Sequence, residues 1–358
     1  MMFPVLLNTG TLQPEAPITG YSSLIWNERY SAADEFKLVT SDIERTLALL
    51  PHDSLISLQD SRRFMIVESH EIEKNSEGGY QLTVSGYGFE GFYKHRVITA
   101  KYFSRNEWSV HHTPEAIIQV LLSENVGFNA RDDFQRVPQY RPGFLSTGLK
   151  EIKRVIQDGE LESVINDLLT SYNVGLRSHR PAGNERYEDI STVVVHQGAN
   201  RALGESDSPV VFDTTSGDLT DESYIDSTAD YKNLVYQMVY DNSDESSSSR
   251  LYPGYFVPGL ATKVAFDSTD WDEWADEKLS QRRELYNRKR RQTLFQGTVK
   301  LPPGVTYGTN LNIGDLVTVK GAFGFQDKMR LTEFTRIEDA EGDRSYPTLA
   351  KDKDLPDE

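Results

Sequence analysis

The chain has 358 residues, of which 37% are hydrophobic and 11% aromatic, enough apolar mass to bury cores and to exclude a disordered protein. It contains no cysteine, which excludes disulfides, thiolate metal sites and cysteine nucleophiles. The formal net charge is −17, from 38 basic and 55 acidic residues, a sign that disfavours tight nucleic-acid binding through phosphates.

The N-terminal sequence MMFPVLLNTG has a short apolar run but no basic region and no small-residue cleavage site, so we expect no signal peptide. No window approaches the ~20 apolar residues that a membrane span requires, and we expect a soluble protein. The negative charge has two interpretations. It either provides general solubility or forms a surface that lets DNA pass without retaining it.

Residues 1–105 are predicted to form a first β-barrel module. Residues 21–30 are β-prone, and a short helix is expected over 42–50. The sequence Asn75–Gly79 is a turn signal, and apolar and polar residues alternate after it. This pattern predicts a hairpin over residues 64–85.

Residues 106–185 have a different pattern and are predicted to form an α/β insert. Thr113 is a suitable N-cap and is followed by a proline, which predicts a helix ending near Gly127. An apolar stripe predicts a second helix over 160–172. Residues 137–143, rich in proline and arginine, are predicted to form a loop between them.

Residues 186–250 are predicted to supply the first part of a second β-barrel module. Strands are expected at 191–196, 210–213 and 233–240. The sequence DNSDESSSS over 241–249 has no core-forming residue and predicts a mobile surface loop.

Residues 251–292 are predicted to form a helical insert. Its helix, over about 271–291, begins with acidic and ends with basic residues, which complements the helix macrodipole. Residues 293–348 are expected to complete the second module, and 349–358 to form a disordered tail. The predicted fold is β-rich α+β, with two small β-barrel or split-sheet modules and α-containing inserts.

Two hairpin regions far apart in the chain have similar spacing. In each, a strand beginning at an aspartate, Asp53 or Asp315, precedes a methionine, Met65 or Met329, by 12 and 14 residues respectively. A turn glycine follows each methionine by 13 residues. The spacing fits an internal duplication and also fits chance similarity between two hairpins. With a duplication, a ring of three chains would present six like units.

The predicted helix over 271–291 holds the strongest candidate for chemistry. Asp272 and Asp276 lie one helical turn apart, as do Glu273 and Glu277, and paired carboxylates serve acid–base catalysis or divalent-ion binding. The alternative, which we favour, is a solvated first turn that complements the helix dipole.

The other candidate motifs are weaker. His111 and His112 are adjacent and share no strand or helix face, and no HExxH spacing occurs. Asp213–Gly217 lacks the triplet of an aspartic protease. The basic run Arg288–Arg291 suits a helix C-terminus or a subunit contact. We therefore predict no enzymatic activity, no catalytic, cofactor-binding or metal-binding residue, and no cofactor.

A set of motifs runs along the chain, from a Trp-x-x-basic-aromatic strand to a Gly-Asp-x-Val-x-Val strand. The segments are Trp26–Tyr30, Phe36–Leu38, Met65–Ile72, Leu82–Gly86, His95–Ile98 and Ile313–Val319. This set resembles a family of siphophage minor tail proteins, common in phages of actinobacteria, that share the fold of tail-hub proteins. The chain departs from the family pattern at Asp34–Glu35, where a glycine is favoured.

The resemblance implies a homotrimeric hub at the distal end of a phage tail. Such a hub has two barrels per chain, and its pseudo-sixfold ring docks on a hexameric tail. The implied partners are the distal tail protein, other tail-tip proteins and the tape measure protein, with DNA passing through the centre. The implied location is the virion tail tip, after assembly in the host cytoplasm. Two rival functions stay open: a tail-associated cell-wall hydrolase, and a carbohydrate- or nucleic-acid-binding barrel protein.

Overall fold

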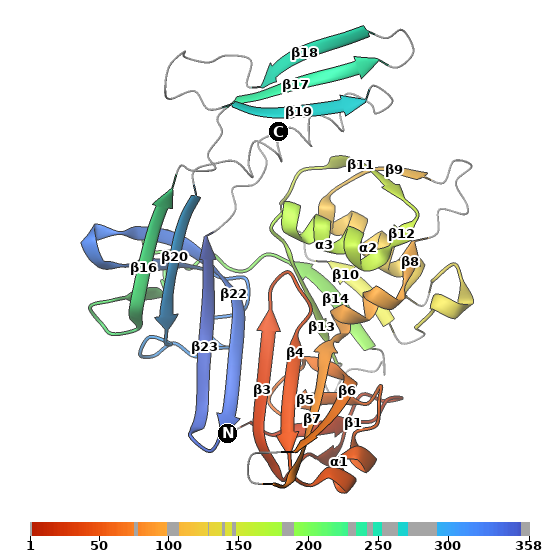
Figure 1. Ribbon diagram of the computed structural model, residues 1–358, viewed down its shortest axis with the longest axis vertical. Helices are drawn as coiled ribbons and strands as arrows, with labels where there is room; N and C mark the ends of the chain where they lie inside the picture. The colour runs from red at the N-terminus through yellow and green to blue at the C-terminus, as the bar shows by residue number, and fades with distance from the viewer. Residues whose placement is uncertain are drawn as a thin grey trace. The chain divides into compact units, whose positions relative to one another are not determined.

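The computed structural model describes residues 2–74, 78–98, 107–127, 129–137, 140–144, 148–180, 190–227, 234–241, 246–252, 264–270 and 292–351 (Figure 1). The chain divides into two compact units. Unit 1 comprises Met1–Thr220 with Thr298–Asp352, and unit 2 comprises Asp221–Gly297 with Lys353–Glu358. The module boundaries expected from the sequence remain predictions. None of the helices described here is long and apolar enough to cross a membrane.

Unit 1 is built on an eleven-stranded mixed sheet with the strand order β15-β21-β22-β3-β4-β7-β6-β5-β1-β2, in which β23 also pairs with β22. Pairing is antiparallel throughout, except between β15 and β21. The strands are β1 (Pro4–Leu7), β2 (Pro14–Pro17), β3 (Tyr21–Arg29), β4 (Glu35–Thr40), β5 (Leu55–Leu58), β6 (Phe64–Lys74), β7 (Tyr80–Gly88), β15 (Val211–Asp213), β21 (Leu316–Lys320), β22 (Gln326–Asp339) and β23 (Gly342–Lys351).

The expectation of two small β-barrel or split-sheet modules is corrected in part by this sheet. Strands from the first 105 residues and from residues 293–348 belong to one sheet, and no closed barrel is found among the described strands. The cause is the length of β22, which has 14 residues. Its first part pairs with β21, and its second part pairs with β3. The broader prediction of a β-rich α+β fold is confirmed.

The predicted local elements of the first region are confirmed. Helix α1 (Ile43–Leu49) lies where a short helix was expected, and β6 with β7 forms the expected hairpin. Within this part of the sheet, alternate side chains of the strands point into one core cluster. It includes Leu24, Trp26, Phe36, Leu38, Met65, Val67, Leu82 and Val84. The alternation that predicted the strands is thus the alternation that buries this core.

Residues 89–196 contain the predicted insert and are called the insert from here on. In this region two helices pack with short strands and 3-10 turns. The elements are η1 (Phe89–His95), β8 (Val97–Ile98), β9 (Glu107–His112), α2 (Pro114–Asn125), η2 (Asp133–Gln135), β10 (Tyr140–Phe144), β11 (Ile152–Gln157), β12 (Gly159–Glu160), α3 (Leu161–Ser171), β13 (Gly175–His179) and β14 (Ile190–His196). A second core cluster joins side chains of α2 and α3 to Leu55 and Phe64 of the large sheet. The insert is therefore packed on the sheet.

Both predicted helices of the insert are confirmed, and the predicted loop over 137–143 is partly wrong. Tyr140–Phe144 forms strand β10, which pairs in parallel with β14. Tyr140 is fully buried, and its hydroxyl lies 2.7 Å from that of Tyr93. Pairing with a strand distant in sequence therefore overrides the local proline signal. Figure 1 shows α2 and α3 beside β10 and β14.

The remaining strands include one ribbon and one small sheet. β16 (Leu219–Ser227) pairs with β20 (Gln292–Val299), and unit 2 contains a sheet in the order β18-β17-β19. Its strands are β17 (Leu234–Asp241), β18 (Ser246–Tyr252) and β19 (Val264–Asp270).

Three predictions for this part of the chain are corrected. Part of the expected loop 241–249 belongs to β18, because Ser246–Ser249 pair with β17. Strand β19 lies within the segment predicted to be a helical insert. Residues 349–351, expected to belong to a disordered tail, are part of β23, which extends to Lys351. The predicted helix over 271–291 lies outside the described residues.

The two hairpin regions with similar spacing have the same strand register. Ile56 is opposite Met65 in the first, as Val317 is opposite Met329 in the second. A register shift follows in both regions, at Val67/Ser69 in the pairing of β6 with β7 and at Leu331/Glu333 in the pairing of β22 with β23. An irregularity at the same place is a stronger sign of equivalence than alternation, which all hairpins share.

The turn that enters each region is also the same. The backbone N–H of Asp53 donates to the carbonyl of Val67 at 2.9 Å, and that of Gly314 donates to Leu331 at 2.8 Å. Asp53 and Gly314 both have positive φ, of 65° and 90°. Asp53 therefore corresponds to Gly314 and not, as the spacing had suggested, to Asp315. The structure supports a repeat of β5-β6-β7 as β21-β22-β23.

We predict that Gly314→Ala destabilises the protein more than Gly308→Ala. Both glycines have positive φ, so both substitutions carry a strain of about 1 kcal/mol. A Cβ on Gly314 would also lie 2.5 Å from the ring of Tyr30, whereas Gly308 faces open space. Urea unfolding of both variants measures the difference. If both variants lose the same free energy of unfolding, the close approach of Gly314 to Tyr30 does not add to the destabilisation.

Candidate functional site

A buried polar junction in unit 1 joins chain segments that are far apart in sequence. At its edge, the Tyr30 hydroxyl donates to the carbonyls of Asn173 at 2.9 Å and His196 at 3.2 Å. The Tyr30 backbone N–H donates to the carbonyl of Thr332, and the Tyr30 carbonyl accepts from Leu176. One residue after β3 thus bonds to the insert and to β22.

Arg63 is the centre of this junction and is 7% exposed. Its guanidinium lies 3.1 Å from a carboxylate oxygen of Glu28 and 2.5 Å from one of Asp34. The second oxygen of Asp34 accepts the backbone N–H of Arg29 at 2.7 Å. Both carboxylates are less than 10% exposed, so all three charges are held away from water and depend on one another.

Further groups connect the C-terminal strands and the insert to the same centre. The Tyr307 hydroxyl donates to Glu28 at 2.5 Å, and the Tyr307 ring stacks on Phe334 of β22 at 3.8 Å between centroids. Glu90 of η1 is buried and accepts the backbone N–H of Ser178 in β13. We call the group formed by Arg63, Glu28, Asp34, Glu90 and Tyr307 the Arg63 cluster.

Burial and neighbouring charges change the pKa values of Asp34, Glu90 and Arg63 in this cluster. Burial raises the pKa of Asp34, and Arg63 opposes this rise. Burial also raises the pKa of Glu90, again against the effect of Arg63. Burial alone would lower the pKa of Arg63, but the charges of Asp34 and Glu28 raise it well above its usual value. Arg63 therefore stays charged and compensates the carboxylates.

Two histidines of the insert lie in the positive field next to the cluster. Burial lowers the pKa of His179 to about 3, and the charge of Arg177 adds to the effect. Burial also lowers the pKa of His196 well below its usual value. Both imidazoles are therefore neutral at neutral pH, and each would have to acquire a charge against this field in acid.

The Arg63 cluster cannot act as an open catalytic site. Its charged members are at most 7% exposed, so no substrate could reach them without unfolding the junction. Two cavities among the described residues have other linings, one around Met2–Tyr21 and one around Asp213–Thr215. The arrangement fits a structural joint between the N-terminal strands, the insert and the C-terminal strands.

The sequence did not single out the Arg63 cluster. Its members are separated by up to 279 residues, and none occupies a specified position of a spaced motif, since Glu28 is an unspecified position of Trp26–Tyr30. The one available signal was at Asp34, where the chain departs from the glycine of the family pattern.

The candidate histidines lie on strand β9 and have separate partners. His111 is 3.7 Å from Glu151, and both side chains are exposed. The His112 Nδ1 accepts the backbone N–H of Thr113 at 2.9 Å. The described part of the chain holds no group of three or more metal-ligating side chains.

Asp213, singled out for its likeness to an aspartic-protease loop, ends strand β15. One of its carboxylate oxygens accepts both the backbone N–H and the hydroxyl of Thr215 at 2.8 Å. These bonds lower the pKa of Asp213, whereas the proton-sharing pair of an aspartic protease has one strongly raised pKa. Asp213 therefore stabilises its own turn.

The acidic pairs Asp272/Asp276 and Glu273/Glu277 and the basic run Arg288–Arg291 lie outside the described residues. The preference for a solvated helical turn at these residues stays a prediction.

The fold is that of known phage tail proteins. The 43 kDa tail protein of prophage MuSo2 from Shewanella oneidensis matches with a TM-score of 0.62 and 11% identity, covering 99% of this chain and 100% of that one. The tail protein from Neisseria meningitidis MC58 matches with 0.59 and 13%, covering 99% and 98%. Prophage tail protein gp18 from Listeria monocytogenes EGD-e matches with 0.56 and 11%, covering 98% and 95%.

Residues 4–341 match the family model described as Siphovirus ReqiPepy6 Gp37-like protein. The chain belongs to this family of phage tail proteins, and it is a component of the virion. The resemblance inferred from the motifs is thereby confirmed. A search of curated proteins finds no match.

We predict that Arg63→Met lowers the free energy of unfolding by roughly 3–5 kcal/mol, because it leaves Glu28 and Asp34 buried without their cation. Arg45→Met is the matched control: Arg45 is exposed and lies 3.9 Å from Asp42, so its loss should cost less than about 1 kcal/mol. Urea unfolding at pH 7 measures both. Similar small losses for the two variants would show that the Arg63 cluster is not a structural joint.

We predict that wild-type protein loses stability in acid faster than His179→Gln. The pKa of His179 is lower in the folded state than in the unfolded state, so the unfolded state gains the proton first as the pH falls below about 6.5. The difference in unfolding free energy between the two proteins should change by about 1.4 kcal/mol per pH unit between pH 6 and pH 4. Asp34 acts in the opposite direction but is present in both proteins. Parallel pH profiles would contradict the burial of a neutral imidazole.

Proposed function

We propose that this tail protein is a non-enzymatic hub subunit of the tail tip. Three copies form a ring at the distal end of the tail, which matches a sixfold tail to a threefold tip and guides the tape measure protein and DNA. The subunit assembles in the host cytoplasm with the distal tail protein and other tail-tip proteins. Membership of a phage tail family supports a location in the phage tail. The proposed symmetry of the ring is supported by the internal repeat of the folded chain.

The observation that carries this proposal is the repeat of β5-β6-β7 as β21-β22-β23. Both copies lie in unit 1 and share strand register, entry turn and register shift. A threefold ring of chains with two like units each offers six like positions. A sixfold neighbour could then make six similar contacts with a threefold ring.

The charge of the chain supports a role as a passage for DNA. A net charge of −17 repels the phosphate backbone, so a ring of such subunits would not retain the DNA that moves through it. We expect no tight nucleic-acid binding. The closed Arg63 cluster, the largest group of buried charges described here, supports a structural rather than a catalytic role.

Oligomeric mass tests the proposal directly. Light scattering should give a particle of three times the 40.6 kDa chain, and negative-stain imaging should show a threefold ring. A protein that remains monomeric at high concentration would contradict the ring. Clearing of a cell-wall suspension by the purified protein, abolished in Asp272→Ala, would favour the rival hydrolase.

A further inference from the structure

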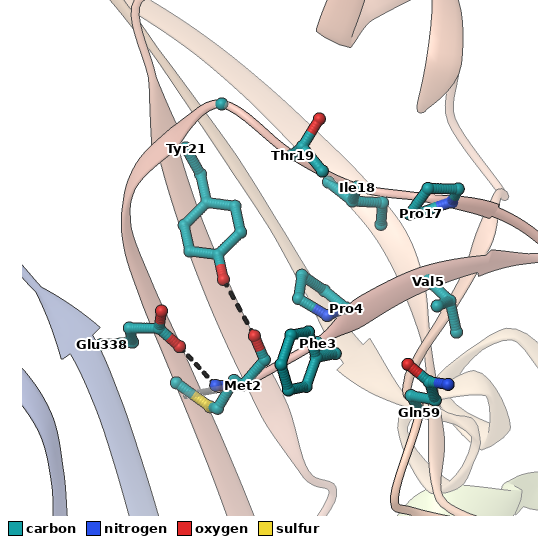
Figure 2. A pocket seen from close by; sticks show the side chains of 11 residues that line it. Met2, Phe3, Pro4, Val5, Pro17, Ile18, Thr19, Tyr21, Gln59 and Glu338 are labelled. Carbon is teal, nitrogen blue, oxygen red and sulfur yellow. Dashed lines mark hydrogen bonds between the residues drawn. The ribbon is translucent and has the colours of Figure 1, made fainter.

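A cavity of about 320 Å³ lies beside the N-terminal strand of unit 1 (Figure 2). Met2 and Ile18 line it and are buried, whereas the Phe3 side chain is 55% exposed. Pro4, Val5 and Pro17 complete most of the apolar lining. The cavity is large enough for one aromatic side chain. Thr19 and Gln59 are also in its lining, and Tyr21 and Glu338 form a polar side of their own.

That polar side is acidic. Glu338 of β22 lines the cavity and accepts the backbone N–H of Met2. Tyr21 also lines it, with its hydroxyl donating to the Met2 carbonyl at 3.1 Å. Asp343 of β23 lies opposite Glu338 in the pairing of β22 with β23, so a second carboxylate-bearing residue is next to the one that lines the cavity. Burial raises the pKa of Tyr21 to about 12, and the negative charges of Glu338 and Asp343 add to the rise. An apolar group with a neighbouring cation fits this site.

The same unit carries an apolar protrusion with a neighbouring cation. Phe134 of η2 is 76% exposed, the highest value among the described large apolar side chains, and Val97 of β8 is 43% exposed. They are held close together because the buried Gln135 side chain accepts the backbone N–H of Val97 at 2.9 Å. Two neighbouring exposed apolar side chains are a candidate contact, whereas isolated ones are ordinary.

Arg96 provides the cation at this protrusion. Its guanidinium donates to the carbonyls of Gln135 and His95 at 2.9 Å and lies 4.2 Å from the centroid of the Phe92 ring. These partners are neutral, so among the described contacts its positive charge is not compensated by a carboxylate. A carboxylate from another molecule would supply that compensation.

From these observations we propose that the protrusion of Phe134, Val97 and Arg96 on one copy packs into the cavity beside Phe3 and Glu338 on the next. The inference rests on the proposed ring and names the surfaces that form it. The two surfaces differ, so the contact is head to tail, and such contacts close into rings when the rotation allows. Figure 1 shows β8 beside α2 and β12, apart from β1 in the lower part of unit 1, so the two surfaces are separate.

The contact combines an aromatic anchor with an opposite-charge pair. Phe134 would fill the cavity, and Arg96 would approach Glu338 and Asp343. A standard interface buries about 800 Å² on each partner, so neighbouring residues must add area around this anchor. Buried aromatic anchors supply most of the binding energy in such interfaces.

The experiment uses the absence of native cysteine. A variant carrying both Phe3→Cys and Asp133→Cys, which keeps the Phe134 anchor and uses the exposed residue before it, is oxidised and examined on a denaturing gel. We expect covalent oligomers up to the trimer, because disulfides require Cα atoms within about 7 Å. The control carries Ile72→Cys and Asp133→Cys, since Ile72 is about half exposed, as Phe3 is, but lies on the β6–β7 hairpin. It should give no trimer.

A charge exchange provides a second readout by light scattering. Glu338→Arg and Arg96→Glu should each lower the oligomeric mass, and the double variant should restore it. One outcome is that wild-type protein forms trimers while the cysteine pair gives no covalent trimer and the charge variants keep the trimer mass. That result would contradict this contact but would agree with the proposed ring. If wild-type protein forms no trimer and the cysteine pair gives none, the ring itself fails.

Discussion

One buried cation, Arg63, holds together parts of the chain that would otherwise have separate cores. Its carboxylate partners come from the N-terminal strands, while Tyr307 brings in the C-terminal region through Glu28. A buried charge is costly unless opposite charges and hydrogen bonds compensate it. The carboxylates of Glu28 and Asp34 compensate Arg63 in the relative position of the segments that the structure shows. The cluster thus fixes the angle at which strands and insert meet, which nonpolar packing alone would leave less specific.

Local structure was largely predictable because it depends on periodicity and capping. The β6–β7 hairpin and helices α2 and α3 were predicted from alternation, N-cap residues and apolar stripes, and the structure has all three. β10 was missed because its strand character comes from pairing with β14, which no local pattern encodes. The two modules were predicted to be separate, yet β22 joins them because one strand pairs with two partners in succession.

The candidate site was less predictable than the fold. Arg63 and its partners carry no motif, and their importance arises only when folding removes water from all of them. The motifs that did attract attention, such as Asp213 and the His111–His112 pair, lie at a turn and on an exposed strand with local partners. The duplication was visible as spacing, but its exact alignment required the hydrogen bonds of Asp53 and Gly314.

A subunit with two like hairpin repeats is suited to a ring between partners of different symmetry. The central claim is that the two hairpin repeats within unit 1, β5-β6-β7 and β21-β22-β23, occupy equivalent positions in the proposed ring. A cryo-electron microscopy map of the assembled tail tip, with only threefold symmetry imposed, tests it most directly. The account predicts β5-β6-β7 and β21-β22-β23 at the same radius and height, about 60° apart. Finding the two units at different radii would contradict it.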